Sequence, residues 1–325
     1  MHKVYDKWPE IAKEYFEKDL RKIDVDNIDH IVFAGMGGSG SIGDVFSAIL
    51  SKTKIHISIV KGYHLPNTVN SNTLVVTTSV SGNTIETLTV LDLARKAKNK
   101  IIAFSSGGKM EAYCKKYKLE HRKISFIHSQ RASLTAFLYS MLNVLNNIIP
   151  LTKNDVLESI NSLENLSKEI SSSNLTKNNP SLDLAYWITG IPIIYYPWGL
   201  QAAAIRFKNS LQENAKIHVI AEDIVESCHN GIVSWERPSN VQPILLEGKD
   251  DYIKTKEKWR ILKEYFKVSG INYKEIHSIS GSILSKITHF IYLLDYAAIY
   301  RAVIAKTDPS PIKSIEFIKS RIQPE

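Results

Sequence analysis

Short apolar runs alternate with amphipathic segments along the first half of the chain. The segments Ile85–Lys96 and Lys109–Tyr117 carry apolar residues at helical spacing, so both are predicted to be helices. The alternation predicts a parallel sheet with helices on both faces. Five strands suit the flavodoxin-like, doubly wound order 2-1-3-4-5, in which ligands bind beyond the carboxyl ends of strands 1 and 3. The predicted strands are His30–Gly35, Ile55–Val60, Leu74–Thr78, Lys100–Phe104 and Lys123–Phe126.

The pattern changes after a predicted helix at Ala132–Ile149, where Pro150 interrupts it. A helix is predicted at Asp155–Ile170, and the Ser- and Asn-rich tract 171–180 is predicted to be an exposed loop. Alternation then resumes, with strands Pro192–Tyr195, Ile217–Ala221, Gln242–Glu247 and Tyr273–Ile276 and helices Leu200–Asn214, Tyr252–Val268 and Leu284–Lys306. We therefore expect an α/β fold of two doubly wound parallel-sheet domains with the active site between them. The predicted domains are residues 1–150 and 151–325.

Composition narrows the class of protein. Hydrophobic residues make up 44% of the 325 residues and charged residues 23%, which is typical of a soluble globular protein. No stretch approaches the roughly 18 apolar residues that span a bilayer, and the charged N-terminus lacks the apolar run of a secretory signal. The two cysteines, Cys114 and Cys228, form neither a disulfide framework nor a metal quartet. We therefore expect a cytoplasmic protein.

The charge pattern indicates the kind of partner. The formal net charge is +8, but the lysines are scattered, without a basic stripe interleaved with aromatic residues. This pattern favours a small anionic substrate over nucleic acid or a membrane surface. The histidines are also scattered, with no H-x-x-x-H or clustered His/Cys/carboxylate signal, so no metal site is predicted.

The first loop of interest, Gly35–Ser41, follows predicted strand 1 and precedes a helix. Its glycines allow positive φ and let backbone amides approach an anion at a helix N-terminus. The run matches G-x-G-x-x-G, so a dinucleotide site must be considered. The acidic residue expected about 20 residues later is missing, because Val60, Lys61 and Gly62 stand there. The loop is not a P-loop either, since no lysine follows Gly40.

The second loop, Ser79–Thr84, lies between predicted strand 3 and a helix whose first turn holds Glu86. Three hydroxyls and a glycine at a helix N-terminus form a phosphate cradle without a formal cation. An ordinary helix cap is the alternative interpretation of these hydroxyls. Because strands 1 and 3 are neighbours in the proposed order, both loops face one crevice, and the pair predicts a phosphate site.

Four separated motifs resemble a known family. GMGGSGSIGD and TTSVSGNTIETL resemble the paired loops of sugar isomerase (SIS) domains, and LQENAKIHVIAEDIVESCHNG and DPSPIKSIEFIKSRI are similar to segments of bifunctional phosphoglucose/phosphomannose isomerases. The resemblance covers nearly the whole chain. It implies two SIS-type domains in a homodimer that needs no metal or cofactor. It also implies interconversion of glucose 6-phosphate, and of mannose 6-phosphate, with fructose 6-phosphate through ring opening and a cis-enediolate.

The resemblance assigns the binding residues by position. Ser79, Ser81 and Thr84 match the phosphate ligands of the family, and Gly38 and Ser39 match residues that line the sugar site.

Two further residues match the groups that move the proton. Arg131 matches an arginine near C1 and C2, where a guanidinium would stabilise an enediolate. Glu213 matches the base that carries the proton between C2 and C1. Without the resemblance, the alternatives are a surface arginine at a helix start and a solvated glutamate at a helix end.

His229 matches the residue that assists ring opening, and in the family it reaches across from the partner subunit. Its neighbour Cys228 raises the alternative of a Cys/His nucleophile. Adjacent residues rarely point at each other, and small buried cysteines are common, so this alternative is disfavoured.

Lys319 matches a lysine at the sugar ring, and a physical argument also singles it out. Ile312, Ile315, Ile318 and Ile322 form an apolar stripe at helical spacing, and Lys319 falls inside it. A lysine that faces inward needs a partner or a function, unless its ammonium group reaches out to water.

The chain departs from the family at a few positions. Val80, Gln130 and Gln212 replace residues that are more common in relatives, and none of these changes removes a reacting group. The hydroxyl linked to mannose 6-phosphate use is not aligned securely, and Ser310 and Ser314 are candidates. Two other functions stay open: a non-catalytic sugar-phosphate sensor, disfavoured because no helix-turn-helix module is evident, and an NADP-dependent oxidoreductase, which would rest on GMGGSG and Lys61.

Overall fold

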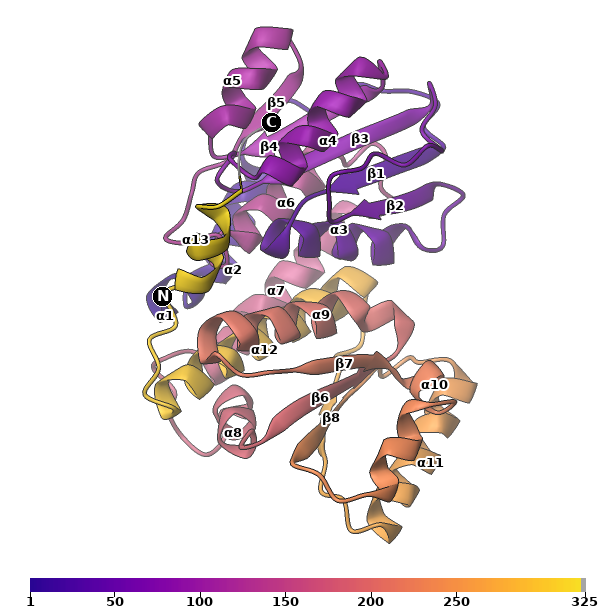
Figure 1. Cartoon of the computed structure of the whole chain (residues 1–325), viewed down its shortest axis with the longest axis vertical. Coiled ribbons are helices and arrows are strands. Elements are labelled where there is room, and N and C mark those ends of the chain that lie inside the picture. The colour runs from indigo at the N-terminus through magenta and orange to yellow at the C-terminus, as the bar shows by residue number, and fades with distance from the viewer. Residues whose placement is uncertain (323–325) are drawn as a thin grey trace. The chain divides into compact units, whose positions relative to one another are not determined.

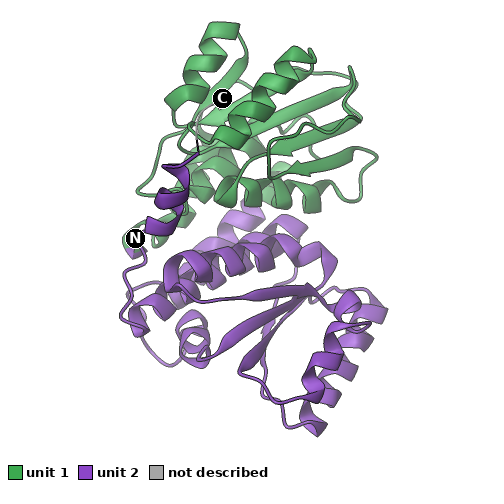
Figure 2. Ribbon diagram, viewed as in Figure 1, with its two compact units in different colours: residues 1, 3–156, 324 green, residues 2, 157–323, 325 purple. Residues whose placement is uncertain are grey.

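A computed structural model of the chain describes residues 1–322. Its internal contacts separate two compact units, residues 3–156 (unit 1) and residues 157–322 (unit 2), coloured separately in Figure 2. The division lies within helix α7 (Lys153–Ile170). Each unit is described by itself.

Unit 1 contains a five-stranded parallel sheet in the order β2-β1-β3-β4-β5. The predicted strand order is therefore confirmed. Strands β1 and β3 are buried along their whole length, as expected for the centre of a parallel sheet. The strands are β1 (His30–Ala34), β2 (His56–Val60), β3 (Thr73–Ser79), β4 (Lys100–Ser105) and β5 (Glu120–Lys123).

Helices cover both faces of this sheet. Figure 1 shows α4 (Ile85–Lys96) and α5 (Gly108–Tyr117) on one face, and α3 (Gly37–Leu50) and α6 (Leu134–Val144) on the other. Helix α6 is almost entirely buried because α2 (Trp8–Glu17) packs against it. The short helix α1 (His2–Tyr5) precedes α2.

Unit 2 contains a four-stranded parallel sheet in the order β7-β6-β8-β9. In each unit the first strand therefore lies between the second and the third. The predicted α/β class with parallel sheets is confirmed. Figure 1 shows α9 and α12 on one face of this sheet and α10 and α11 on the other. The strands are β6 (Ile191–Tyr196), β7 (Ile220–Asp223), β8 (Val241–Glu247) and β9 (Lys274–His277). The helices after α7 are α8 (Pro180–Trp187), η1 (Trp198–Leu200), α9 (Gln201–Ser210), η2 (Leu211–Ala215), α10 (Ile224–Ser227), η3 (Gly231–Glu236), α11 (Ile253–Val268), α12 (Ile283–Ile304) and α13 (Lys313–Lys319).

Two edge strands, β5 and β7, differ most from the sequence predictions. Strand β5 lies three residues before the predicted Lys123–Phe126. The apolar residues on which that prediction rested lie after the strand, where Ile124 is buried and Phe126 is 51% exposed. Strand β7, the edge strand next to β6, lies later than the predicted Ile217–Ala221 instead. The polar tract 171–180 is not wholly exposed, since buried Asn179 accepts a hydrogen bond from the Leu182 amide at 2.9 Å and begins α8.

Helix α12 is the core helix of unit 2. It is long and apolar enough to cross a membrane by length and composition alone, which the sequence analysis did not allow for. In the structure, however, 78% of its most apolar window is buried inside the protein, as in the core helix of a folded domain.

Candidate functional site

The loop between β3 and α4 gathers the three hydroxyls predicted to hold a phosphate. The hydroxyls of Ser79 and Thr84 lie 2.9 Å apart, and Ser79 Oγ also accepts a hydrogen bond from the Gly82 amide at 3.1 Å. Ser81 Oγ accepts one from the Asn83 amide at 3.3 Å. These neutral groups can both donate to and accept from a phosphate oxygen, so the geometry fits the predicted cradle.

Helix α4 begins at this loop without a side-chain cap. Thr84 stands at the N-cap position in an extended conformation, and its side chain makes no capping hydrogen bond. The first amides of an α-helix have no partner within the helix, and the helix dipole makes this end positive. The interpretation of the hydroxyls as an ordinary cap is therefore wrong for Thr84, and the helix start suits an anion.

A third segment, which the sequence analysis missed, braces this loop from the end of β4. The carbonyl of Gly82 accepts from the Met110 amide at 2.9 Å, and Asn83 Oδ1 accepts from the Lys109 amide at 3.0 Å. Gly82 has φ +70°, and a Cβ there would lie 1.9 Å from the Gly107 carbonyl oxygen. The adjacent glycines Gly107 and Gly108 could have indicated this contact in the sequence, because both adopt positive φ, a conformation that favours glycine.

The first glycine loop joins the second. Ser39 Oγ accepts a hydrogen bond from the Val80 amide at 3.3 Å, so the two loops meet as the strand order predicts. Gly35 permits this approach, since a Cβ there would lie 2.9 Å from the Thr78 carbonyl oxygen. Ser39 is buried and Gly38 is half-buried at the start of α3, which also lacks a side-chain cap.

Lys61, on which the dinucleotide alternative rested, is engaged elsewhere. Its ammonium group lies 2.6 and 2.8 Å from the two carboxylate oxygens of Asp44 on α3. Burial raises the pKa of Asp44, while Lys61 acts in the opposite direction. A 2′-phosphate would have to displace this ion pair, so the geometry disfavours the NADP interpretation.

Arg131 lies in unit 1 in the turn before α6, which begins at Leu134 rather than at the predicted Ala132. Arg131 is only 6% exposed, so the alternative of a surface arginine is wrong. The turn is fixed by Ser133, whose hydroxyl accepts from the Ile127 amide at 2.9 Å and donates to the Ser129 carbonyl at 2.8 Å. The pKa of nearby His128 is lowered by burial first, then by the N-terminal charge and Arg131.

Glu213 lies in unit 2 on a π-helical turn, Leu211–Ala215, that continues α9. Glu213 is half-buried. The ammonium group of Lys216 donates to the backbone carbonyl of Glu213 and, at 2.7 Å, to that of Pro311. Lys216 therefore ties the Glu213 turn to the segment that leads into α13. The sequence predicted a continuous helix to Asn214, and no sequence signal marks the wider turn.

His229 is exposed in the turn after α10, where its amide donates to the Glu226 carbonyl at 2.9 Å. Its neighbour Cys228 is half-buried, and burial raises the pKa of the Cys228 thiol. A raised pKa keeps the thiol protonated near neutrality, which agrees with the rejection of a Cys/His nucleophile.

Lys319 does not face inward in this chain. Helix α13 has no buried residue, Lys319 is exposed, and Ile318 is 60% exposed. The orientation expected from the apolar stripe is therefore wrong, although the assignment of Lys319 to the sugar ring stays a prediction. Of the candidates for mannose use, Ser310 donates its amide to Asp308 at 2.8 Å, and Ser314 is exposed.

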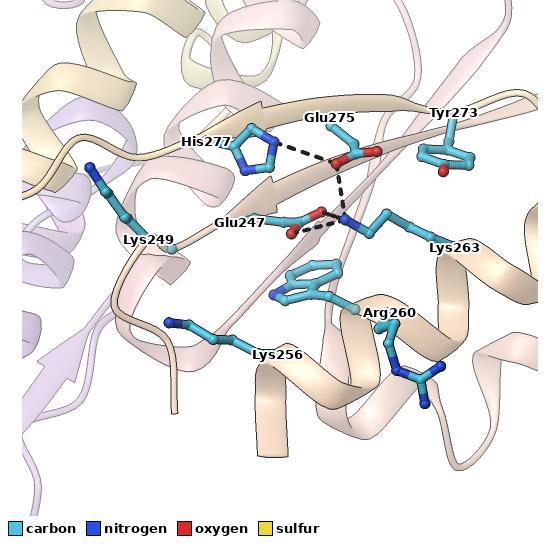
Figure 3. A pocket seen from close by; sticks show the side chains of 10 residues that line it. Glu247, Lys249, Lys256, Arg260, Lys263, Tyr273, Glu275 and His277 are labelled. Carbon is cyan, nitrogen blue, oxygen red and sulfur yellow. Dashed lines mark hydrogen bonds and ion pairs between the residues drawn. The ribbon is translucent and has the colours of Figure 1, made fainter. Parts of the chain in front are cut away.

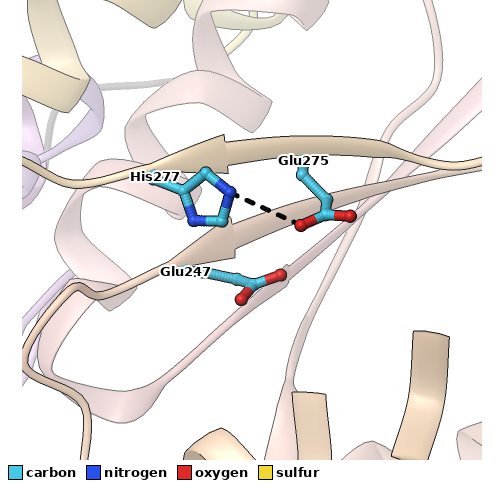
Figure 4. A group of neighbouring side chains, drawn as sticks. All are labelled: Glu247, Glu275 and His277. Carbon is cyan, nitrogen blue, oxygen red and sulfur yellow. Dashed lines mark ion pairs between the residues drawn. The ribbon is translucent and has the colours of Figure 1, made fainter. Parts of the chain in front are cut away.

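A cavity of about 500 Å³ lies in unit 2 where β8 and β9 end, beside α11 (Figure 3). None of the predicted site residues lines it. Glu247, Glu275 and His277 bring three donor atoms within 4.8 Å of one another there, so they are the described residues that could hold a metal ion (Figure 4). The Lys263 ammonium already lies 3.0 Å from both carboxylates, and a cation would have to replace it.

Comparisons with known proteins agree with this arrangement. The family model described as "SIS domain" matches residues 25–145, and the model described as "Bacterial phospho-glucose isomerase C-terminal SIS domain" matches residues 177–322. In solved structures, the C-terminal domain of glucosamine-fructose-6-phosphate aminotransferase from Francisella tularensis aligns with a TM-score of 0.70. The alignment covers 95% of this chain and 97% of that one at 17% identity, so it shows the fold alone.

Two curated relatives span almost the whole chain. A D-glucosamine-6-phosphate 4-epimerase of Sulfolobus acidocaldarius is 26% identical over 99% of this chain and 97% of its own length. A bifunctional phosphoglucose/phosphomannose isomerase of Caldicellulosiruptor bescii is 32% identical over 98% of this chain and 97% of its own length. With both SIS matches in place, the chain belongs to the family of bifunctional phosphoglucose/phosphomannose isomerases.

Proposed function

We propose that the chain is an aldose–ketose isomerase that interconverts glucose 6-phosphate and mannose 6-phosphate with fructose 6-phosphate. Family membership over the full length supports this activity. The observation that carries it is the loop after β3, where three hydroxyls meet a helix start without a side-chain cap. Ser79, Ser81 and Thr84 would bind the 6-phosphate there, with Gly38 and Ser39 beside the sugar.

The chemistry would proceed in two stages. Lys319 and His229 open the sugar ring by moving a proton to the ring oxygen and from the C1 hydroxyl. Glu213 then removes the proton from C2, a cis-enediolate forms, the proton of the C2 hydroxyl passes to the oxygen on C1, and the same carboxyl group returns its proton to C1. Arg131 stabilises the negative oxygen of the enediolate, and its burial supports this role because charges interact more strongly away from water. No metal or cofactor takes part in this proposal.

The proposal includes a homodimer in which His229 completes the partner's site. The exposure of His229 on its turn is consistent with such a contribution. Mixing Glu213→Gln subunits with His229→Ala subunits would then regenerate one intact site per heterodimer. Sites built from a single chain would show no such recovery. The proposal also places the enzyme in the cytoplasm, in glycolysis and gluconeogenesis, where its substrates would be phosphorylated sugars.

A coupled assay of the purified protein tests the activity. We expect turnover of both aldose 6-phosphates to fructose 6-phosphate, unchanged after exhaustive chelation. Binding of these sugars without turnover would instead identify a sensor. Glucosamine 6-phosphate belongs in the same assay, because one relative is named a 4-epimerase of that compound. Turnover of glucosamine 6-phosphate alone would contradict the proposed substrates.

A further inference from the structure

A buried polar cluster joins helices α9 and α12 inside unit 2. Arg206 is 2% exposed and Asp295 is not exposed at all. Asp295 Oδ2 accepts from Arg206 Nη2 at 2.7 Å and from Nε at 3.1 Å, and Asp295 Oδ1 accepts from the hydroxyl of Ser210. Each ion is therefore paired in a forked geometry, as burial of charge requires.

Such a cluster fixes geometry more than it adds stability. Replacing a buried ion pair by apolar residues is often neutral for stability, whereas a paired set of donors permits only a narrow range of orientations. Here the hydrogen bonds hold two successive turns of α9, at Arg206 and Ser210, against one residue of α12. The rotation of the end of α9 about its own axis is thereby set.

The π-helical turn begins directly after Ser210, at Leu211. In a continuous α-helix, positions 206, 210 and 213 would share one face, so Glu213 would point toward Asp295 as a second carboxylate. The π turn has more residues per turn than an α-helix, so it changes the direction of Glu213 relative to that face. Leu211 and Asn214 are fully buried, while Glu213 is half-buried. The π turn is the last turn of this helix, because Lys216 follows it in the left-handed conformation with φ +58°.

We propose that Ser210, Arg206 and Asp295 are positioning residues that hold the π turn and so aim the Glu213 carboxylate at the substrate. The inference rests on the proposed role of Glu213 as the base. The Ser210 hydroxyl is the decisive contact, because it anchors the last residue before the turn to Asp295. Without this anchor the end of α9 is less firmly oriented, and the carboxylate shifts relative to C2.

The test is the Ser210→Ala variant, which removes one hydroxyl and leaves the ion pair in place. A displacement of about 1 Å at a reacting group reduces turnover by up to about 10²-fold, so we expect kcat to fall roughly 10- to 100-fold with KM for glucose 6-phosphate unchanged. Ser181→Ala is the matched control: its hydroxyl is also fully buried and donates to α12, at the Leu293 carbonyl, 2.7 Å away. We expect Ser181→Ala to lower the melting temperature similarly but to keep kcat.

A double-mutant cycle with Glu213→Gln separates this inference from the proposed function. If Ser210 acts through Glu213, Ser210→Ala causes no further loss in the Glu213→Gln background. A parental kcat for Ser210→Ala, with Glu213→Gln inactive, overturns the positioning role alone. An equal loss of kcat in Ser181→Ala and Ser210→Ala also overturns it, since general destabilisation then explains both. A parental kcat for Glu213→Gln overturns the base assignment and this inference together.

Discussion

The loop after β3 and the loop after β8 occupy the same place in their two sheets. Each follows the third strand of its unit, which pairs with the first strand on the side away from the second, and each leads into a helix, α4 or α11. The side chains that bond within the loop after β3 are hydroxyls and an amide. In the loop after β8, by contrast, the Asp251 carboxylate accepts from the Gly248 amide at 3.0 Å and from the Trp259 indole at 2.9 Å.

The difference in charge indicates why two loops at the same place in the strand order would differ in their ability to bind a phosphate. Asp251 places the protein's own negative charge in the loop of unit 2, so a phosphate there would meet a like charge. The neutral hydroxyls of Ser79, Ser81 and Thr84 leave the loop of unit 1 able to receive one. Unit 2 instead carries Glu213, His229 and Lys319, the groups proposed for proton transfer.

The largest effect is expected from Gly82→Ala in the loop after β3. A residue other than glycine at positive φ costs about 1–3 kcal/mol, and the added Cβ would also clash with the Gly107 carbonyl 1.9 Å away. We expect a melting temperature several degrees lower and a KM for glucose 6-phosphate raised by more than about 10²-fold. Gly62→Ala is the control, because no atom outside its own chain neighbours lies within 4 Å of its Cβ position. If Gly82→Ala and Gly62→Ala changed the melting temperature and KM equally, the close packing of the loop after β3 against Gly107 would be unimportant for binding.

Ser81→Asp makes the loop of unit 1 resemble that of unit 2 in charge. A carboxylate beside the 6-phosphate costs several kcal/mol through repulsion of like charges, so KM should rise about 10²-fold or more. Ser81→Asn, similar in size but neutral, should raise KM much less. Steady-state kinetics of the two variants measure this difference. If Ser81→Asp and Ser81→Asn had equal KM values, the phosphate would not bind beside Ser81.

Thr84→Ala removes one hydroxyl from the cradle without adding charge. A hydrogen bond to a charged group contributes about 0.5–3 kcal/mol net, which corresponds to a roughly 2- to 150-fold rise in KM. Thr89→Ala on the same helix is the control, since its hydroxyl donates to the Ile85 carbonyl at 3.0 Å. A Thr84→Ala enzyme that binds substrate like the parent would contradict the cradle.

The smallest effect is expected at Asp251. Burial raises the pKa of Asp251, against the effect of its hydrogen bonds, so the folded state binds a proton more tightly than the unfolded state. Unfolding free energy therefore falls as pH rises from the unfolded pKa through the folded one. We expect the parent to lose stability relative to Asp251→Asn between about pH 4 and pH 7, with KM unchanged in the variant. Urea unfolding at both pH values measures this, and a constant difference would contradict it.

The sequence predicted β1 and β3 better than the edge strands β5 and β7. Strands β1 and β3 are fully buried, so their apolar runs coincide with their hydrogen-bonded lengths. Strand β5 is paired on one side only, and its residues include Glu120 and Lys123, so hydrophobicity no longer marks the strand. The predicted strand was placed on the apolar residues that follow it.

The candidate site was predictable where local chemistry determined it. Hydroxyls and glycines between a strand and a helix identified the loop after β3, and the strand order brought Ser39 to it. The π turn at Glu213 could not be predicted, because the residue that ends it in the left-handed conformation, Lys216, is not the glycine that usually marks a helix end. The apolar stripe around Lys319 misled for another reason: periodicity predicts which residues share a face, but not whether another element covers that face.

The most direct test of the account is proton exchange at C2 in the Glu213→Gln enzyme. The substitution keeps the shape of the side chain but removes the proton acceptor, so turnover should fall about 10²–10⁴-fold with substrate binding retained. Glu264→Gln, a change at an exposed glutamate on α11, should exchange like the parent. We expect that Glu213→Gln no longer exchanges the C2 proton of glucose 6-phosphate with solvent deuterium. Exchange at the parental rate would show that another residue is the base, and the proposed mechanism would be wrong.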